Sequence, residues 1–258
     1  MDLDNSDNYI NQKLALHRPT LSVLDAQAII NFLSPHIRQW SNGYLSSINL
    51  SGSIAKGTAI SGTTDVDILV SLQPTTPDNL QSIHNTLFNK LTEIGYSPRR
   101  QNVALGINHI YGNRTVSVDI VPAKKQQLWT SNHSIWSHKK STWRMTNVLN
   151  HINYVSRSNR LDEIKTMKIW RKCNNIDFPS FLLELVTIQA LRNNRSSSIA
   201  DKVGAVFLYI RDELPTARII DPSNTNNDVA DELTQQEKNN LSRIAGNLIG
   251  QSWNNAIW

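Results

Sequence analysis

The sequence predicts an α/β protein of the α+β type, in which a small mixed sheet backed by helices is followed by an all-helical lobe. Between residues 45 and 122, short apolar runs are separated by turns that contain glycine, as expected for strands. From about Met145 onward, apolar residues instead recur at helical spacing. We therefore expect two domains, residues 1–144 and residues 145–258.

Length and composition are those of a globular protein. The 258 residues suffice for a sizeable core, and 39% hydrophobic with 18% charged residues excludes a disordered chain. No apolar run approaches the ~20 residues that a membrane span needs, and the N-terminus lacks the features of a signal peptide. The lone cysteine, Cys173, argues for a reducing compartment. We expect a cytoplasmic protein that has no membrane partner.

The charge balance favours an anionic ligand. The net charge of +5 and the isoelectric point of about 9.3 suit nucleotides or RNA. This excess is smaller than that of most dedicated nucleic-acid binders.

Two helices are expected before the first strand. One lies within residues 1–18, and the next begins near Ser22. Pro35 should kink or end the second helix. Its apolar face is predicted from helical spacing to contain Leu21, Leu24, Ala28 and Phe32.

The strands of the sheet are expected on either side of turns that contain glycine. One strand runs into Gly52-Ser53, and a second covers Asp65–Val70 after the turn. A helix is predicted over Asn79–Ile94, with Gly95 as its stop. Two further strands, Val103–Tyr111 and Val116–Pro122, should form a hairpin through Gly112-Asn113.

The second half is predicted to be helical after an irregular crossing. Residues 124–144 are polar and aromatic without a clear period, so we expect no regular element there. The helices that follow are expected at Leu161–Cys173, at Pro179–Asn193 and along Ile199–Ile210. A last helix should begin at a capping box formed by Thr234 and Glu237.

The stretch Asn49–Val70 contains the residues with the clearest chemistry. Alternate side chains of a strand point the same way, so Asp65 and Asp67 should share one face. Two adjacent carboxylates repel each other unless a cation lies between them, and hard divalent cations prefer such ligands. The turn at Gly52-Ser53 offers unobstructed backbone N–H groups and a hydroxyl, as a phosphate cradle requires. Together they indicate phosphoryl or nucleotidyl transfer.

A third carboxylate is expected from the later hairpin. Asp119 lies among apolar residues in the strand Val116–Pro122. By itself it would be interpreted as an ordinary exposed strand residue. With Asp65 and Asp67 nearby in the fold, metal ligation is the better interpretation.

The pattern of these residues resembles the signature of the DNA polymerase β-like nucleotidyltransferase superfamily. It comprises Gly52, Ser53, Gly57, Thr58, Gly62, Asp65 and Asp67. Looser segments of the second half resemble the branch that contains 2′-5′-oligoadenylate synthetases, cyclic GMP-AMP synthases with their bacterial CD-NTase relatives, and archaeal-type CCA-adding enzymes. These segments are Thr146-Asn147…His151, Lys168-x-Trp170, Phe178–Leu185 and Ile220-Asp221-Pro222…Ala230. The resemblance implies a catalytic palm followed by a helical lobe.

The resemblance also implies roles for individual residues. Asp65 and Asp67 would bridge two Mg²⁺ or Mn²⁺ ions, and Asp119 would complete the site of the activating ion and help take the hydroxyl proton. Gly52 and Ser53, with the nearby backbone, would hold the β- and γ-phosphates of a nucleoside triphosphate, with ATP as the expected substrate.

Two nucleotide-binding residues are expected from the second half. The setting of Lys168 matches the phosphate-binding lysine of the family, although a solvated basic helix face explains its neighbours Lys165 and Lys172. Ser180 matches a serine that reaches the same phosphates, and capping of a helix is an equally good interpretation.

Three functions fit these residues. The first is synthesis of a cyclic or linear oligonucleotide signal, as in the antiviral defence of the bacterial relatives, and a regulatory protein partner is compatible with it. The second is addition of nucleotides to an RNA 3′ end, such as that of a tRNA. The third is a catalytically silent nucleotide-binding module. The three intact acids argue against the third function, and the segments of the second half favour the first.

Overall fold

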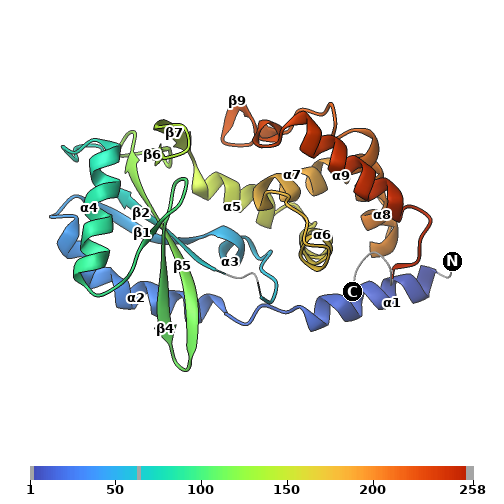
Figure 1. Ribbon diagram of the computed structural model, residues 1–258, viewed down its shortest axis with the longest axis horizontal. Coiled ribbons are helices and arrows are strands. Elements are labelled where there is room, and N and C mark those ends of the chain that lie inside the picture. Colours follow the sequence, from blue (N-terminus) through green and yellow to red (C-terminus); the bar gives the residue numbers. More distant parts are fainter. Residues whose placement is uncertain (1–2, 63–64, 254–258) are drawn as a thin grey trace. The chain divides into compact units, whose positions relative to one another are not determined.

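A computed structural model describes residues 3–62 and 65–253 of the chain. The contacts divide these residues into two compact units (Figure 1). We call residues 20–57 and 62–153 the sheet unit. We call residues 1–19, 58–61 and 154–258 the helical unit. The chain thus enters the helical unit for four residues in the middle of its signature motif.

The sheet unit contains a seven-stranded mixed sheet among the described residues, with β1, β2, β5, β4 and β3 as successive neighbours. β2 and β5 are parallel, and the other pairs are antiparallel. β4 and β5 are joined by the expected two-residue turn, since Tyr111 pairs with Arg114. The strands are β1 (Leu45–Ser51), β2 (Val66–Leu72), β3 (Arg99–Arg100), β4 (Leu105–Tyr111), β5 (Arg114–Lys125), β6 (His133–Ser137) and β7 (Thr142–Thr146). The mixed sheet confirms the predicted fold class.

Helices α2 (Val23–Trp40) and α4 (Leu80–Glu93) pack against each other and against the sheet. The predicted apolar face of α2 is wrong at three positions, because Leu24, Ala28 and Phe32 are exposed. The buried face consists of Ala26, Ile29, Ile30, Leu33 and Ile37. Pro35 is exposed and does not end α2, because buried residues on both sides of it hold the helix against the core.

Residues 124–144 were expected to be irregular, and that prediction is wrong. β6 and β7 form a hairpin that extends the sheet from the end of β5. Two of the inward positions of β6 are polar: His133 lies 2.8 Å from the Ser71 hydroxyl, and Ser137 donates to Asn102. Polar side chains in buried positions conceal the alternation from which a strand is recognised.

The helical unit consists mainly of helices whose ends follow sequence signals. α8 has Ser198 as its N-cap, and α9 begins at the predicted capping box of Thr234 and Glu237. The helices assigned wholly to this unit are α1 (Leu3–Leu16), α6 (Leu161–Cys173), α7 (Ser180–Ala190), α8 (Ile199–Asp212) and α9 (Gln235–Leu248). Strands β8 (Ile220–Asp221) and β9 (Asn224–Asp228), which were not predicted, form a small hairpin before a 3₁₀ turn at Val229–Glu232. α5 (Val148–Ser156) crosses the boundary between the units.

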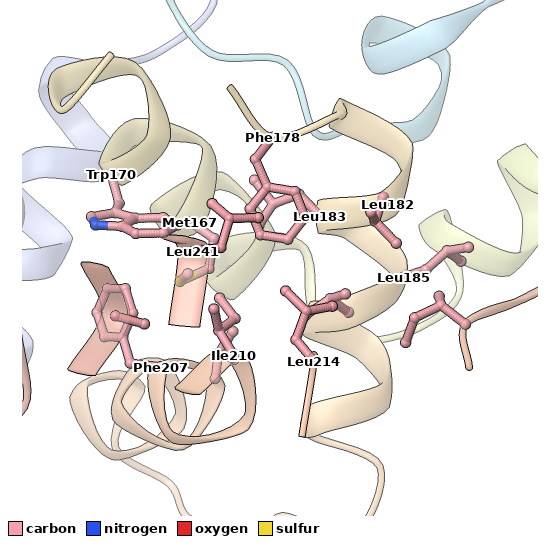
Figure 2. Close-up of a cluster of buried hydrophobic side chains, with 14 of the residues drawn as sticks. Met167, Trp170, Phe178, Leu182, Leu183, Leu185, Phe207, Ile210, Leu214 and Leu241 are labelled. Atoms are coloured by element: carbon pink, nitrogen blue, oxygen red, sulfur yellow. The ribbon is translucent and has the colours of Figure 1, made fainter. Parts of the chain in front are cut away.

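The core of the helical unit is built from α6, α7, α8 and α9. Figure 2 shows Trp170, Phe178 and Phe207 in this cluster together with aliphatic side chains. The rings of Trp170 and Phe207 meet edge to face at 5.2 Å between centroids. Burial of these large side chains supplies the main stabilisation of the unit.

The division by contacts differs from the expected boundary at residue 144. α1 belongs to the helical unit, because it packs against α6 and α8, and Asp7 accepts hydrogen bonds from Ser198 and from the Ala200 N–H. Within the described residues, no helix has both the length and the apolar composition needed to cross a membrane. The cytoplasmic location stays a prediction.

The core predicts a clear contrast between two residues of α8. Ile210 is fully buried in the cluster, whereas Leu208 is 42% exposed. Ile210→Ala should lower the free energy of unfolding by about 2–5 kcal/mol, because a cavity remains. Leu208→Ala should change it by under about 1 kcal/mol. Urea unfolding followed by circular dichroism measures both, and equal effects would contradict the packing of α8.

Candidate active site

One row of residues crosses the sheet and contains two of the predicted carboxylates. Asp67 on β2 is the register partner of Asp119 on β5. The row continues to Ser51 on β1 and to Gly106 on β4, and from there to Arg99 on β3. Partners in adjacent strands project to the same side of a sheet, so the carboxylates of Asp67 and Asp119 lie beside each other.

Asp65 lies two residues before Asp67, on the same side of the sheet. It precedes β2, and its carboxylate accepts a hydrogen bond from the side chain of Ser117. Ser117 is two residues before Asp119, so the strand period places both on one face. The structure therefore brings Asp65, Asp67 and Asp119 together, as the sequence predicts.

Gly52 lies directly against the carboxylate of Asp67. It begins the short helix α3 (Gly52–Lys56) in the left-handed region, with φ of +64°. A Cβ at this position would lie 1.7 Å from Oδ2 of Asp67. The Ser53 backbone N–H donates to the same carboxylate. Only glycine permits this approach of the turn to the acid.

The electrostatics of the site disfavour three free negative charges. Burial raises the pKa of Asp67 to about 6, and the charges of Asp119 and Asp65 add to the rise. Burial also raises the pKa of Asp119, with Asp65 as the second cause. The pKa of Asp65 is raised by burial and partly restored by Ser117. Mutual repulsion of this kind is relieved by a bound cation.

Three residues beside Asp119 were not predicted. Gln101 donates to Oδ1 of Asp119 over 2.8 Å. The charge of Arg99 lowers the pKa of both Asp119 and Asp65. Gly106 leaves room for this arrangement, since a Cβ there would lie 2.8 Å from Nε2 of Gln101 and 3.1 Å from Oδ1 of Asp119. No motif marks Gln101 or Arg99, whereas Ser117 was open to prediction from its period with Asp119.

The chemistry of these carboxylates fits a divalent cation. All three are oxygen donors, and the turn at Gly52 leaves the space that a side chain would fill. Within residues 3–62 and 65–253, no group of three or more His, Cys, Asp and Glu side chains already has the arrangement of a metal site. The acids therefore share one electrostatic neighbourhood, and ion binding would require their side chains to converge.

The other two predicted site residues, Lys168 and Ser180, belong to the helical unit. The Lys168 ammonium is 4% exposed and contacts Oε1 of Glu184 at 2.6 Å and Oγ1 of Thr58 at 2.9 Å. Ser180 is the first residue of α7 after the N-cap Pro179, and its hydroxyl accepts a hydrogen bond from Arg171. Since Pro179 and not Ser180 is the N-cap of α7, the structure does not place Ser180 in the capping position. Contact of either residue with phosphate stays a prediction.

Two cavities differ in their relation to the predicted chemistry. A cavity of about 240 Å³ in the sheet unit is lined by Asp65, Ser117 and Arg114, among others. A larger, mostly apolar cavity of about 410 Å³ in the helical unit lies along α8 and contains none of the predicted site residues. Only the smaller of these two cavities includes a residue of the carboxylate group.

The fold and the carboxylate site define a protein with the architecture of the polymerase β-like nucleotidyltransferases. No family model matches the chain. A cyclic AMP-AMP-AMP synthase of Escherichia coli strain MS 115-1 is 24% identical in an alignment of 223 residues, with 72% of this chain and 69% of that protein covered.

Solved structures of CD-NTases have the same fold. The Bradyrhizobium diazoefficiens CD-NTase CdnG in complex with GTP matches with a TM-score of 0.79 and 14% identity, over 99% of this chain and 92% of the other. CdnC of E. coli MS115-1 with ATP matches with a TM-score of 0.75 and 20% identity, over 93% and 89%. The same CdnC in a complex with HORMA-deltaN gives 0.72 and 21%, over 89% and 84%. These matches confirm the resemblance to the CD-NTase branch.

The contact between Gly52 and Asp67 predicts a severe effect of one methyl group. Gly52→Ala should displace the turn or the carboxylate and weaken Mn²⁺ binding at least ~10-fold. Gly43→Ala is the matched control, because Gly43 also has a positive φ (+85°) but nothing lies within 4 Å of the position that its Cβ would take. Its cost should be limited to about 1 kcal/mol of backbone strain. Calorimetric titration measures the Mn²⁺ affinity of both variants, which should be unchanged in Gly43→Ala, and an unchanged affinity in Gly52→Ala would contradict this role of the contact between Gly52 and Asp67.

The raised pKa of Asp67 predicts how stability depends on pH in the absence of metal. Ionisation of Asp67 disfavours the folded state. The stability that the protonated carboxyl contributes is therefore complete below the unfolded pKa of 3.8 and is lost as pH rises through the folded pKa of about 6. Asp67→Asn should therefore raise the free energy of unfolding by up to about 2–3 kcal/mol at pH 8 and by little at pH 4.

This pH dependence is measured by denaturant unfolding in EDTA across the same range. Asp78→Asn, at an exposed acid of the sheet unit, provides the control and should have little effect at either pH. A stabilisation of Asp67→Asn that does not change between pH 4 and pH 8 would argue against a carboxylate with raised pKa.

Proposed function

We propose that this chain is a nucleotidyltransferase that joins the α-phosphate of a nucleoside triphosphate to a hydroxyl and releases pyrophosphate. The observation that carries the proposal is the row in which Asp67 and Asp119 lie side by side with Gly52 against Asp67. Grouped carboxylates next to a turn that begins with glycine suit the handling of a metal-bound triphosphate.

The residues of the proposed site divide the tasks of this reaction. Asp65 and Asp67 hold Mg²⁺ or Mn²⁺, two ions in the proposed arrangement, and Asp119 completes the set and accepts the proton of the attacking hydroxyl. When bound, the ions supply Lewis-acid polarisation of the phosphate and of the attacking oxygen. Gln101 orients Asp119 through its 2.8 Å hydrogen bond. Gly52 and Ser53, with the nearby backbone, hold the β- and γ-phosphates, to which Ser53 and Ser180 contribute hydroxyls.

The product proposed is a cyclic or linear oligonucleotide that acts as a second messenger in antiviral defence. The sequence relative is a synthase of cyclic AMP-AMP-AMP, which supports ATP as a substrate. The matching structures bind GTP and ATP, so a nucleoside triphosphate is the substrate class that they share. The CdnC complex with HORMA-deltaN supports a regulatory protein partner for this chain as well.

Addition of nucleotides to an RNA 3′ end is the second candidate function. It would use the same carboxylate row, because both reactions attack an α-phosphate with a hydroxyl. The basic net charge of +5 is the observation that favours RNA as an acceptor. The acceptor therefore has to be identified by experiment.

Labelled triphosphates distinguish these functions. The chain is incubated with Mg²⁺ or Mn²⁺ and each labelled triphosphate, with and without total RNA. Small oligonucleotide product without RNA is expected, and label only on RNA would instead establish the second candidate. An Asp65→Asn, Asp67→Asn variant should lower the rate at least ~10³-fold, because the ions lose two ligands.

Asp78→Asn is the control for the loss of a carboxylate, since Asp78 is exposed and lies outside the row. It should retain the wild-type rate. Retained turnover in the double variant would reject the carboxylate row as the active site. Binding of triphosphate without any product, under every metal and acceptor condition, would favour the silent module.

A further inference from the structure

The signature motif passes through both units of the protein. Gly52 to Gly57 belong to the sheet unit, residues 58–61 belong to the helical unit, and the chain returns to the sheet unit at Gly62, before Asp65. The segment Thr58–Ser61 is thus linked covalently to the phosphate cradle on one side and to the metal carboxylates on the other.

Two buried charged side chains of the helical unit hold Thr58, the first residue of this segment. Thr58 donates to Oε1 of Glu184 over 2.7 Å and accepts from Lys168 over 2.9 Å. Lys168 and Glu184 form an ion pair at 2.6 Å, with side-chain exposures of 4% and 1%. Thr58 is fully buried. We call these three residues the buried clamp.

The rest of the segment is also held by the helical unit. Ile60 is 2% exposed and belongs to the same hydrophobic cluster as Met167 and Phe178. The Ser61 N–H donates to the carbonyl of His17, and Lys172 donates to the carbonyl of Ser61 over 2.7 Å. The segment is therefore anchored by side chain, by packing and by backbone.

Stability alone does not explain a charged pair in this place. Taking an ammonium and a carboxylate out of water is costly, and well-packed apolar residues often serve a fold equally well or better. The charged pair also fixes the orientation of the Thr58 hydroxyl, which an apolar pair would not do. The Lys168 ammonium donates to the Thr58 hydroxyl and the Glu184 carboxylate accepts from it, so the two residues together favour one orientation of this hydroxyl and of the backbone that carries it.

We propose that Thr58, Lys168 and Glu184 are positioning residues, which hold the motif so that Gly52-Ser53 and Asp65 are presented correctly for nucleotidyl transfer. The inference rests on the proposed function and deepens it. It also gives Lys168 a role other than the direct phosphate contact expected from its Lys-x-Trp setting. Lys168 acts through Thr58, and the loss of any member of the clamp has the same consequence.

Single variants test whether the three residues act as one unit. Thr58→Val, Glu184→Gln and Lys168→Met should each lower kcat about 10–100-fold, the cost of misplacing reacting groups. Thr58→Ser keeps the hydroxyl and should stay within about twofold of the wild type. Lys165→Met is the control on α6, because the ion pair of Lys165 is with the exposed Asp162 at 3.1 Å. If only Lys168→Met changed the rate, and did so through KM for the triphosphate, Lys168 would be a phosphate contact and the proposal would fail.

A double variant separates positioning from stability. Lys168→Met removes the ammonium that lies 2.6 Å from the buried Glu184, leaves Arg171 as the other cation that interacts with this carboxylate, and should lower Tm by roughly 10 °C. Lys168→Met, Glu184→Leu removes both charges and should recover most of that loss. Positioning predicts that kcat stays reduced in the double variant. Recovery of kcat together with Tm would show that the pair is merely structural and would overturn the proposal.

Hydrogen exchange and Mn²⁺ binding report on the clamp without any turnover. In metal-free protein, Thr58→Val should speed amide exchange of residues 52–57 at least ~10-fold, and Thr58→Ser should not. Mn²⁺ affinity should fall about 10-fold in Thr58→Val. If these changes occur and the wild-type protein makes no product, the positioning role of the clamp is supported and the proposed function is rejected. Unchanged exchange and affinity in an active enzyme would reject the clamp.

Discussion

The parallel register of β2 and β5 is the constraint on which the proposed active site depends. It sets Asp67 opposite Asp119, so two acids that are 52 residues apart in the sequence share one neighbourhood. Because the same register places Asp65 beside Ser117, the third acid has its own hydrogen-bond partner. A shift of one residue would turn one of the acids to the opposite face of the sheet. The apolar residues on both sides of Asp67 and of Asp119 maintain the register, since they fill the core.

The acids are held in a state that a cation would stabilise. Their raised pKa values mean that the fold opposes their ionisation, and the turn at Gly52 comes closer to Asp67 than any other residue would permit. The closeness of three buried carboxylates therefore lowers the stability of the metal-free protein when they are ionised. Groups whose pKa values are shifted by burial and by neighbouring charges are frequent at functional sites, which supports the role proposed for these acids.

The sequence predicted well what depends on neighbouring residues and less well what depends on distant ones. The hairpin at Gly112-Asn113 and the capping box at Thr234 are local, and both are found in the structure. The face of α2 was mispredicted, because two overlapping helical stripes of apolar residues exist and only packing against the sheet selects one of them. The β6–β7 hairpin was missed, because its inward side chains His133 and Ser137 are polar and find partners elsewhere in the sheet unit.

The sequence by itself determined the candidate residues of the proposed chemistry: three carboxylates, a glycine-serine turn and the strands and helices that carry them follow from residue type and spacing. Only the tertiary structure decided which groups complete that chemistry. Gln101 reaches Asp119, and Lys168 turns to Glu184 and Thr58, through contacts that no local pattern encodes. The physical reason is that a hydrogen bond between distant residues depends on how the strands and helices pack, whereas a strand or a turn depends on the residues within it.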